Sequence, residues 1–153
     1  MTGNEELAAI AKSLAIGAGK LVVQADRDRP ARAELVEEAT RKSSATDLAT
    51  DADRASERFI VNQLRALRPN DGILGEEGSN ESGSSGLTWL VDPIDGTTNF
   101  VYAFPAWTVS VAVTDGDGAI AGAVYEPVRH ECFAAVRGGG SNLNGRRLGP
   151  LAP

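Results

Sequence analysis

The spacing of apolar residues changes once along this chain of 153 residues, near Ile73. Before that point, apolar residues recur every three or four positions, as in helices that pack one face against a core. After it, short segments alternate between apolar and small or polar residues, as half-buried strands do. We therefore expect an α+β fold in which two N-terminal helices pack on an antiparallel sheet.

The two helices are predicted from their apolar stripes. The first stripe contains Leu7, Leu14 and alanines between them, and the second helix is expected to run from about Asp51 to Leu67. Thr50 and Asp53 form a capping-box pattern at its start. The polar stretch of residues 26–45 lies between the helices, and one or two further helical turns are expected within residues 33–42.

The remaining chain reads as short strands separated by turns. Strands are expected over residues 73–75, 87–91, 109–113, 119–125 and 131–136. Residues 78–86 read GSNESGSSG and are predicted to form a loop with little to order it. Asp115–Gly118 is a hairpin signal.

The most informative segment follows the strand that ends at Val91. Residues 92–96 read Asp-Pro-Ile-Asp-Gly. The proline donates no backbone hydrogen bond and Gly96 permits a positive φ, so the strand end is predicted to be kinked. At such a kink, Asp92, Asp95 and the Ile94 carbonyl can converge on one point. Oxygen ligands without His or Cys suit Mg2+ better than a transition metal.

Acidic residues gather in three clusters near strand or helix ends: Asp47, Asp51 and Asp53; Glu76 and Glu77; Asp92 and Asp95. Carboxylates at a buried strand end repel one another unless a cation neutralises them. Two metal ions that share carboxylates can polarise a phosphoryl oxygen and activate a water molecule. The turn at Gly96–Thr98 is predicted to start a short helix whose N–H groups hold a phosphate.

Three segments in this order closely resemble the inositol monophosphatase family: the approach Asp47–Asp53, the Gly-Glu-Glu of residues 75–77, and DPIDGTTNF at residues 92–100. The resemblance extends from about Leu7 to Leu148. It implies hydrolysis of a phosphate monoester by direct attack of water with Mg2+ as cofactor. It also implies that residues 1–150 are the N-terminal half of the layered αβαβα sugar-phosphatase fold.

The resemblance assigns metal ligands residue by residue. Glu76, Asp92 and the Ile94 carbonyl would hold one Mg2+, and Asp92 and Asp95 would share a second. It equally assigns the catalytic groups: Thr97 with Asp53 would activate the water.

The resemblance also assigns substrate binding, with the amides of Gly96 and Thr97 holding the phosphate beside Asp95. A competing interpretation remains for Asp53, because capping of the second helix would explain this residue without any catalysis. Thr97, in contrast, can cap a short helix and act in catalysis together.

The chain departs from the family pattern because it contains no WDxxAG motif, which belongs to a second half that would begin at residues 151–153. One alternative function is therefore a non-catalytic fragment that binds metal or serves in association. Another is a phosphatase of histidinol phosphate or of nucleotide phosphates within the same superfamily. The ending Thr98–Phe100 favours inositol phosphate as substrate.

The composition of the chain restricts which binding partners and which cellular compartment we expect for it. A net charge of -6 argues against nucleic acid as a partner, since a phosphate backbone calls for a basic surface. Cys132 is the single cysteine, no basic leader opens the chain, and no apolar stretch is long enough for a bilayer. We expect a cytoplasmic protein that binds a small phosphate monoester, does not act at a membrane, and forms a homodimer when full length.

Overall fold

The computed structural model describes residues 3–27 and 44–149, and of residues 44–48 the backbone alone. The helical turns predicted within residues 33–42, and the boundary predicted between residues 150 and 151, lie outside these ranges. The elements in chain order are α1 (Gly3–Arg27), α3 (Ser44–Leu67), β1 (Gly72–Gly75), β2 (Asn80–Glu81), β3 (Thr88–Asp95), α4 (Thr97–Val101), β4 (Thr108–Asp115), β5 (Gly118–Glu126), β6 (Glu131–Val136), β7 (Gly140–Leu143) and β8 (Arg146–Arg147).

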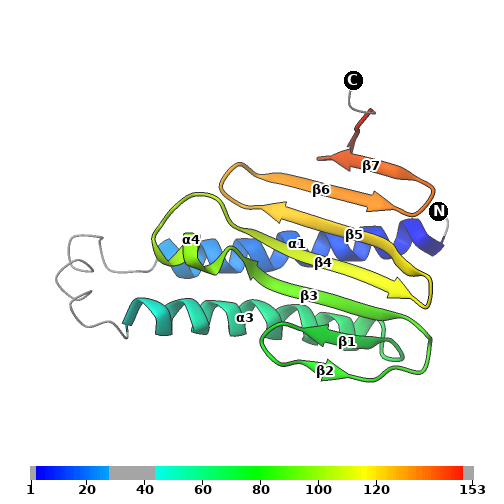
Figure 1. The fold of residues 1–153 in the computed structure, drawn as a ribbon, viewed down its shortest axis with the longest axis horizontal. Coiled ribbons are helices and arrows are strands. Elements are labelled where there is room, and N and C mark those ends of the chain that lie inside the picture. Colours follow the sequence, from blue (N-terminus) through cyan, green and yellow to red (C-terminus); the bar gives the residue numbers. More distant parts are fainter. Residues whose placement is uncertain (1–2, 28–43, 150–153) are drawn as a thin grey trace.

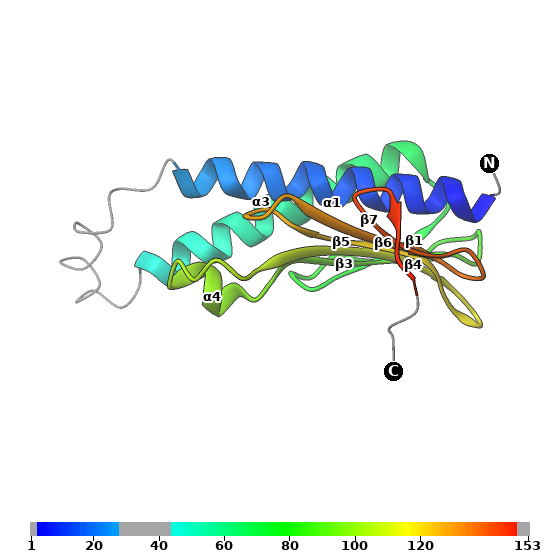
Figure 2. The same ribbon diagram turned by 90° about the horizontal axis from the view of Figure 1, so that it is seen from above.

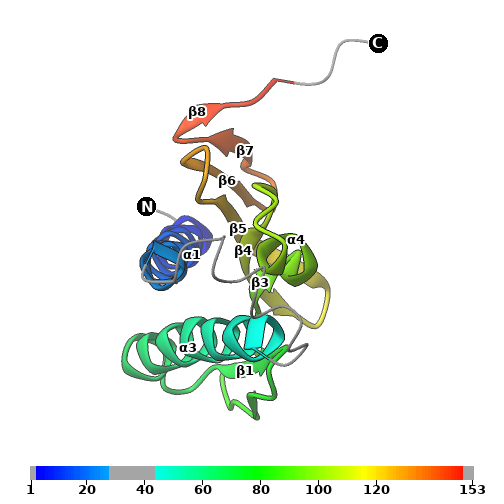
Figure 3. The same ribbon diagram turned by 90° about the vertical axis from the view of Figure 1, so that its left-hand side faces the viewer.

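The two long helices lie on the same face of one sheet (Figures 2 and 3). Alanines at positions 11, 15 and 18 are fully buried on α1, and their small side chains let this helix lie close to the sheet. At Gly19 a Cβ atom would lie 2.6 Å from the Tyr125 ring on β5, so only glycine allows this approach. Within the described ranges, no helix has the length and apolar character needed to cross a membrane.

The sheet has eight strands in the order β2-β1-β3-β4-β5-β6-β7-β8 (Figure 1). Every neighbouring pair is antiparallel except β1 and β3, which are parallel and pair Gly72 with Thr88 and Gly75 with Val91. The predicted α+β class is therefore confirmed, but the sheet is mixed rather than purely antiparallel. The parallel pair brings the carboxyl ends of β1 and β3 to the same edge.

The core lies between the helices and the inward side chains of the sheet. Alternate residues of β4 and β5 are buried here, as the alternating pattern predicts: Val109, Val111, Val113, Ala121, Ala123 and Tyr125. Trp89 of β3 is fully buried, and its indole N–H donates to Asp71 Oδ2 at 2.9 Å.

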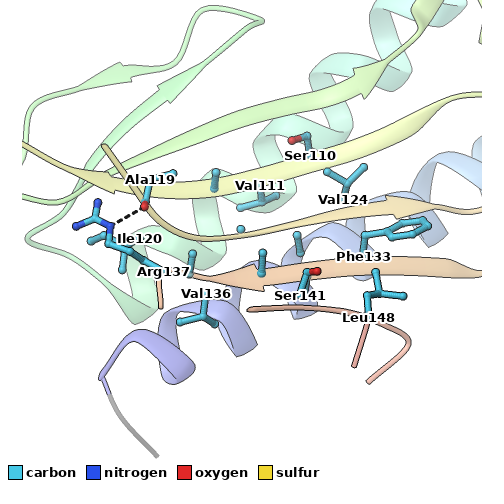
Figure 4. Close-up of a pocket in the computed structure, with 16 residues that line it drawn as sticks. Ser110, Val111, Ala119, Ile120, Val124, Phe133, Val136, Arg137, Ser141 and Leu148 are labelled. Carbon is cyan, nitrogen blue, oxygen red and sulfur yellow. Dashed lines mark hydrogen bonds between the residues drawn. The ribbon is translucent and has the colours of Figure 1, made fainter. Parts of the chain in front are cut away.

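The opposite face of the sheet, away from α1 and α3, is apolar and open; we call it the open face. The register aligns Val124 of β5 with Phe133 of β6 on this face, and they are 37% and 41% exposed. Leu90 of β3 lies on the same face and is 39% exposed. A hollow of about 550 Å3 lies over β4, β5, β6 and β7 on this face, and its lining includes Ser110, Val124, Phe133 and Leu148 (Figure 4).

The second helix starts earlier than predicted. α3 begins at Ser44, so Thr50 and Asp53 lie inside the helix and the predicted capping box is wrong. Ala49 and Ala52 are 1% and 6% exposed. The turn before Asp51 thus contributes buried apolar surface, which outweighs a local capping preference.

The serine- and glycine-rich segment at residues 78–86 is also more ordered than predicted. Its residues Asn80–Glu81 form β2, which pairs antiparallel with β1. The amides of Ser84 and Ser85 both donate to the Asn70 carbonyl, at 2.7 and 3.0 Å. Backbone hydrogen bonds to distant residues order this segment, and composition does not reveal them.

Candidate functional site

The carboxylates from β1 and β3 meet because these two strands are parallel. Gly75 pairs with Val91, and the next amide along the chain, that of Glu76, donates to the Val91 carbonyl at 3.1 Å. Glu76 therefore follows β1 directly alongside Asp92 of β3. The Gly-Glu-Glu and Asp-Pro-Ile-Asp segments therefore share one edge of the sheet, an arrangement that the predicted antiparallel sheet did not include.

The end of β3 is irregular, as its proline and glycine predict. Asp92 pairs with Ser110 and Asp95 pairs with Thr108, with a shift of register between them. The strand nevertheless continues to Asp95, further than the predicted end at Val91. Gly96 follows with φ of 92°, in the left-handed region that favours glycine.

Thr97 opens the short helix α4, as predicted, and its hydroxyl is oriented by the strand end. Thr97 Oγ1 donates to the Ile94 carbonyl at 2.9 Å. A carbonyl oxygen has two lone pairs, so the Ile94 carbonyl can still ligate a cation while it accepts this bond. The structure thus joins the predicted catalytic hydroxyl to a predicted metal ligand.

Asp53 reaches the site from α3. It is 4% exposed, and burial raises the pKa of its carboxyl to about 7, with further contributions from the negative charges of Glu77, Glu76 and Asp92. These neighbours show that Asp53 belongs to the acidic group. Since it lies in the helix interior, helix capping no longer explains it.

Asp92 carries a buried oxygen without a partner. Within the described residues, Asp92 Oδ1 is a buried side-chain atom that makes no hydrogen bond. Burial raises the pKa of the Asp92 carboxyl, and so do a hydrogen bond with Glu76 and the charges of Glu76 and Asp95. An unsatisfied buried acceptor costs about 1–3 kcal/mol, more when it is charged.

The carboxylate and carbonyl oxygens of these residues are the ligand type that Mg2+ prefers, but their side chains are not arranged around one point. Over residues 3–27 and 44–149, no group of three or more Asp, Glu, His or Cys side chains is placed so that it could hold a metal ion. Asp95 is exposed, and Thr108 Oγ1 donates to its Oδ2 at 3.5 Å. Mutual repulsion favours carboxylates that turn apart when no cation is present.

One residue at this site was not predicted from the sequence. Glu57 on α3 is 4% exposed, and its carboxylate accepts the amides of Glu77 at 2.8 Å and Ser79 at 3.0 Å. It follows Asp53 by four positions, which places both on one face of the helix. That spacing is the signal that could have found it.

Carboxylates at the ends of parallel strands beside the start of a helix are suited to bind a cation and a phosphate group side by side. The chain belongs to the inositol monophosphatase family, whose model matches residues 3–151. This is a family of phosphatases, and it is metal-dependent.

Curated relatives agree with the family assignment. The chain is 47% identical to an inositol-1-monophosphatase of Rhizobium meliloti over 104 residues. This match covers 67% of this chain and 39% of the relative. It is 42% identical over 110 residues to the Nus factor SuhB of Pasteurella multocida, with 71% of this chain and 41% of the relative covered.

Solved structures share the fold. Inositol monophosphatase II of Staphylococcus aureus matches with a TM-score of 0.78 at 29% identity, over 94% of this chain and 51% of that one. The SuhB protein of Bartonella henselae matches with a TM-score of 0.76 at 33% identity, over 91% and 51%. The chain therefore spans about half the length of these structures and about two fifths of the curated relatives.

Proposed function

We propose that the protein is a Mg2+-dependent hydrolase of phosphate monoesters, with inositol monophosphates as its substrate class. The observation that carries the proposal is the buried, unpaired Asp92 Oδ1 within a group of carboxylates. A bound cation would satisfy this oxygen and offset both the burial and the neighbouring negative charges that raise the pKa values of Asp53 and Asp92. The all-oxygen donor set favours Mg2+.

The residues divide into metal ligands and reacting groups. Glu76, Asp92 and the Ile94 carbonyl are suited to hold one ion, and Asp92 with Asp95 a second. When bound, Mg2+ would polarise the phosphoryl oxygens, lower the pKa of a water molecule and stabilise the leaving oxygen.

The remaining roles belong to side chains and amides of the chain itself. Thr97 Oγ1 donates to the Ile94 carbonyl, so its own lone pairs are available to accept a hydrogen bond from the attacking water and orient it. The carboxylate of Asp53, buried on α3, would take up the proton that this water loses. The amides of Gly96 and Thr97, at the start of α4, would hold the phosphate, with Asp95 beside it.

The substrate class follows from the relatives. The Rhizobium meliloti relative is named an inositol-1-monophosphatase. The Staphylococcus aureus enzyme has been solved with inositol monophosphate bound and with 2'-AMP bound. Inositol monophosphates are therefore the first substrates to test, and nucleotide monophosphates and histidinol phosphate the competitors.

A second candidate is a non-catalytic fragment that binds metal or serves in association. These residues match about half of each solved relative, so any function that needs the other half would be absent from these residues taken alone. The two candidates differ in turnover rather than in fold. The cytoplasmic location, the homodimer and the lack of membrane or nucleic-acid partners stay predictions.

Phosphate release from inositol 1-phosphate tests the proposal, measured on this chain and on any longer protein that contains it. We expect turnover with Mg2+ and its loss in excess EDTA. Full activity in EDTA, or a requirement for Zn2+, would overturn the metal assignment. No turnover by either protein on any of the three substrate types, with Mg2+ binding retained, would favour the non-catalytic fragment.

A further inference from the structure

We propose that Glu57 is a positioning residue that holds the turn after β1 against α3, so that Glu76 faces Asp92 in the metal site. The inference rests on the proposed function, because it concerns the site that would bind Mg2+. It is carried by contacts of Glu57, Gly75, Glu77 and Ser79 that no assigned role explains.

The Glu57 carboxylate binds the turn at two points. Its Oε2 accepts the amide of Glu77 at 2.8 Å, and its Oε1 accepts the amide of Ser79 at 3.0 Å. Each carboxylate oxygen thus takes one N–H group, and these charge-assisted bonds are stronger than neutral ones. The first of these amides belongs to the residue directly after Glu76.

Glu76 is therefore fixed from both sides. Its own amide donates to the Val91 carbonyl on β3 at 3.1 Å, and the amide of the following residue donates to Glu57 on α3. Inside the turn, the Gly75 amide donates to the Ser79 carbonyl at 2.7 Å. The backbone at Glu76 is held between the sheet and the helix, which sets the direction of its side chain.

Gly75 is the second residue that the contact between Glu57 and the turn after β1 requires. A Cβ atom at this position would lie 2.5 Å from Glu57 Cδ, a distance that real side chains do not tolerate. The carboxylate thus lies directly against the backbone of residue 75. Any side chain there would displace Glu57, so Gly75→Ala should reproduce the loss of Glu57.

The negative charge of Glu57 favours a role in positioning the metal site over a role in structural support alone. Glu57 is 4% exposed and lies one helical turn after Asp53, on the same face of α3. A buried negative charge added to an acidic group is costly unless a cation is bound nearby. A carboxylate at this position therefore suits a turn that works together with a bound cation.

The test uses Glu57→Gln, Glu57→Ala and Gly75→Ala, with Glu81→Gln as the matched control. Glu81 lies on β2 of the same hairpin, where Arg65 pairs with it at the surface. Two quantities are measured at a temperature where every variant is folded: Mg2+ affinity by titration calorimetry, and hydrogen exchange of individual backbone amides by NMR.

We expect Glu57→Ala to weaken Mg2+ binding about 10- to 100-fold, the usual effect of losing a group that orients a metal ligand. The amides of Glu77 and Ser79 should lose protection from exchange. Glu57→Gln retains a single acceptor oxygen, so its affinity should fall between wild type and Glu57→Ala. Glu81→Gln should bind within about twofold of wild type, a small change by the same scale.

Unchanged Mg2+ affinity with faster exchange at both amides would reduce Glu57 to a structural support and overturn the inference. If Glu57→Ala does not fold, Glu57→Gln and Gly75→Ala decide in its place, and equal affinity to wild type in both would overturn it. Failure of the wild-type protein to bind Mg2+ would instead refute the proposed function, and the inference with it.

Discussion

The acidic side chains of the site differ in how many contacts each would make to metal. Asp92 would bridge both ions, whereas Asp53 would act only through Thr97 and the attacking water. We expect Asp92→Asn to lower kcat/KM for inositol 1-phosphate at least about tenfold more than Asp53→Asn, a difference of about 1.4 kcal/mol in the barrier. Asp51→Asn is the control, because Asp51 is exposed on α3, the helix that carries Asp53, and its kcat/KM should be near that of wild type.

The comparison is made by steady-state kinetics in the catalytically active form of the protein. Equal losses for Asp92→Asn and Asp53→Asn, or a greater loss for the second, would contradict the assignment of the bridging ligand.

The raised pKa of Asp53 predicts a pH dependence of stability. The carboxyl has a pKa of about 7 in the folded chain, against 3.8 for an unperturbed aspartate. The folded state therefore binds the proton more tightly, and this stabilisation is complete below about pH 4 and is lost as pH rises through 7. In EDTA, we expect the melting temperature to fall over that range.

Asp53→Asn removes this titration, so it should melt a few degrees higher than wild type at pH 8 in EDTA, at roughly 2–4 °C per kcal/mol for a chain of this size. Thermal unfolding from pH 4 to pH 9 measures the effect. Parallel pH profiles for wild type and Asp53→Asn would show that Asp53 is not the titrating group.

At this scale, the sequence offered candidates only where a motif contains them, and it offered no sign of a side chain that binds backbone amides far along the chain. Asp92 and Asp95 stand out because they interrupt an apolar strand. Glu57 does not, because an acidic residue on a helix is ordinarily solvated and its partners lie about twenty positions away. Asp53 stays a predicted site residue, but its local explanation as a cap was wrong.

At the scale of elements, periodicity located the helices and most strands but not their pairing. The parallel contact between β1 and β3 joins strands whose connecting segment contains the short strand β2 and no helix, whereas parallel neighbours are usually joined through a helix. The early start of α3 was also missed, because Ala49, which precedes the predicted start at Asp51, is buried in the core.

The junction between β3 and α4 depends on Gly96. Its φ is 92°, and a Cβ atom there would lie 3.2 Å from the Ala106 carbonyl oxygen. We expect Gly96→Ala to destabilise the chain by about 1–2 kcal/mol, the cost of the left-handed region for a residue with a side chain. Gly116→Ala is the control, because a Cβ there meets nothing within 4 Å and its φ is ordinary.

Urea unfolding of the two alanine variants measures the difference. Midpoints that coincide within error would mean that the junction relaxes without cost and that Gly96 is not required for the turn.

At the scale of the whole molecule, the chain is two-layered with one face uncovered within the described residues (Figure 3). The open face presents Leu90, Val124 and Phe133, each more than a third exposed. An apolar patch on a sheet promotes association. We expect the 153-residue chain, prepared alone, to self-associate with rising concentration in sedimentation experiments.

Replacing Val124 and Phe133 together by serine should reduce this association. Leu67→Ser is the control, because Leu67 is 55% exposed but lies on α3, on the covered side of the sheet. Association that Leu67→Ser reduces as strongly as the double variant would place the contact elsewhere.

The candidate ligands come from two segments that are separate in the chain, Glu76 directly after β1 and Asp92 to Asp95 on β3. An ion held by both segments would act as a removable cross-link between the turn after β1 and the end of β3. Its contribution to folding would depend on free Mg2+, reaching about 2.7 kcal/mol at a concentration one hundred times the Kd. The lifetime of this protein against proteolysis would then follow the magnesium level of its surroundings.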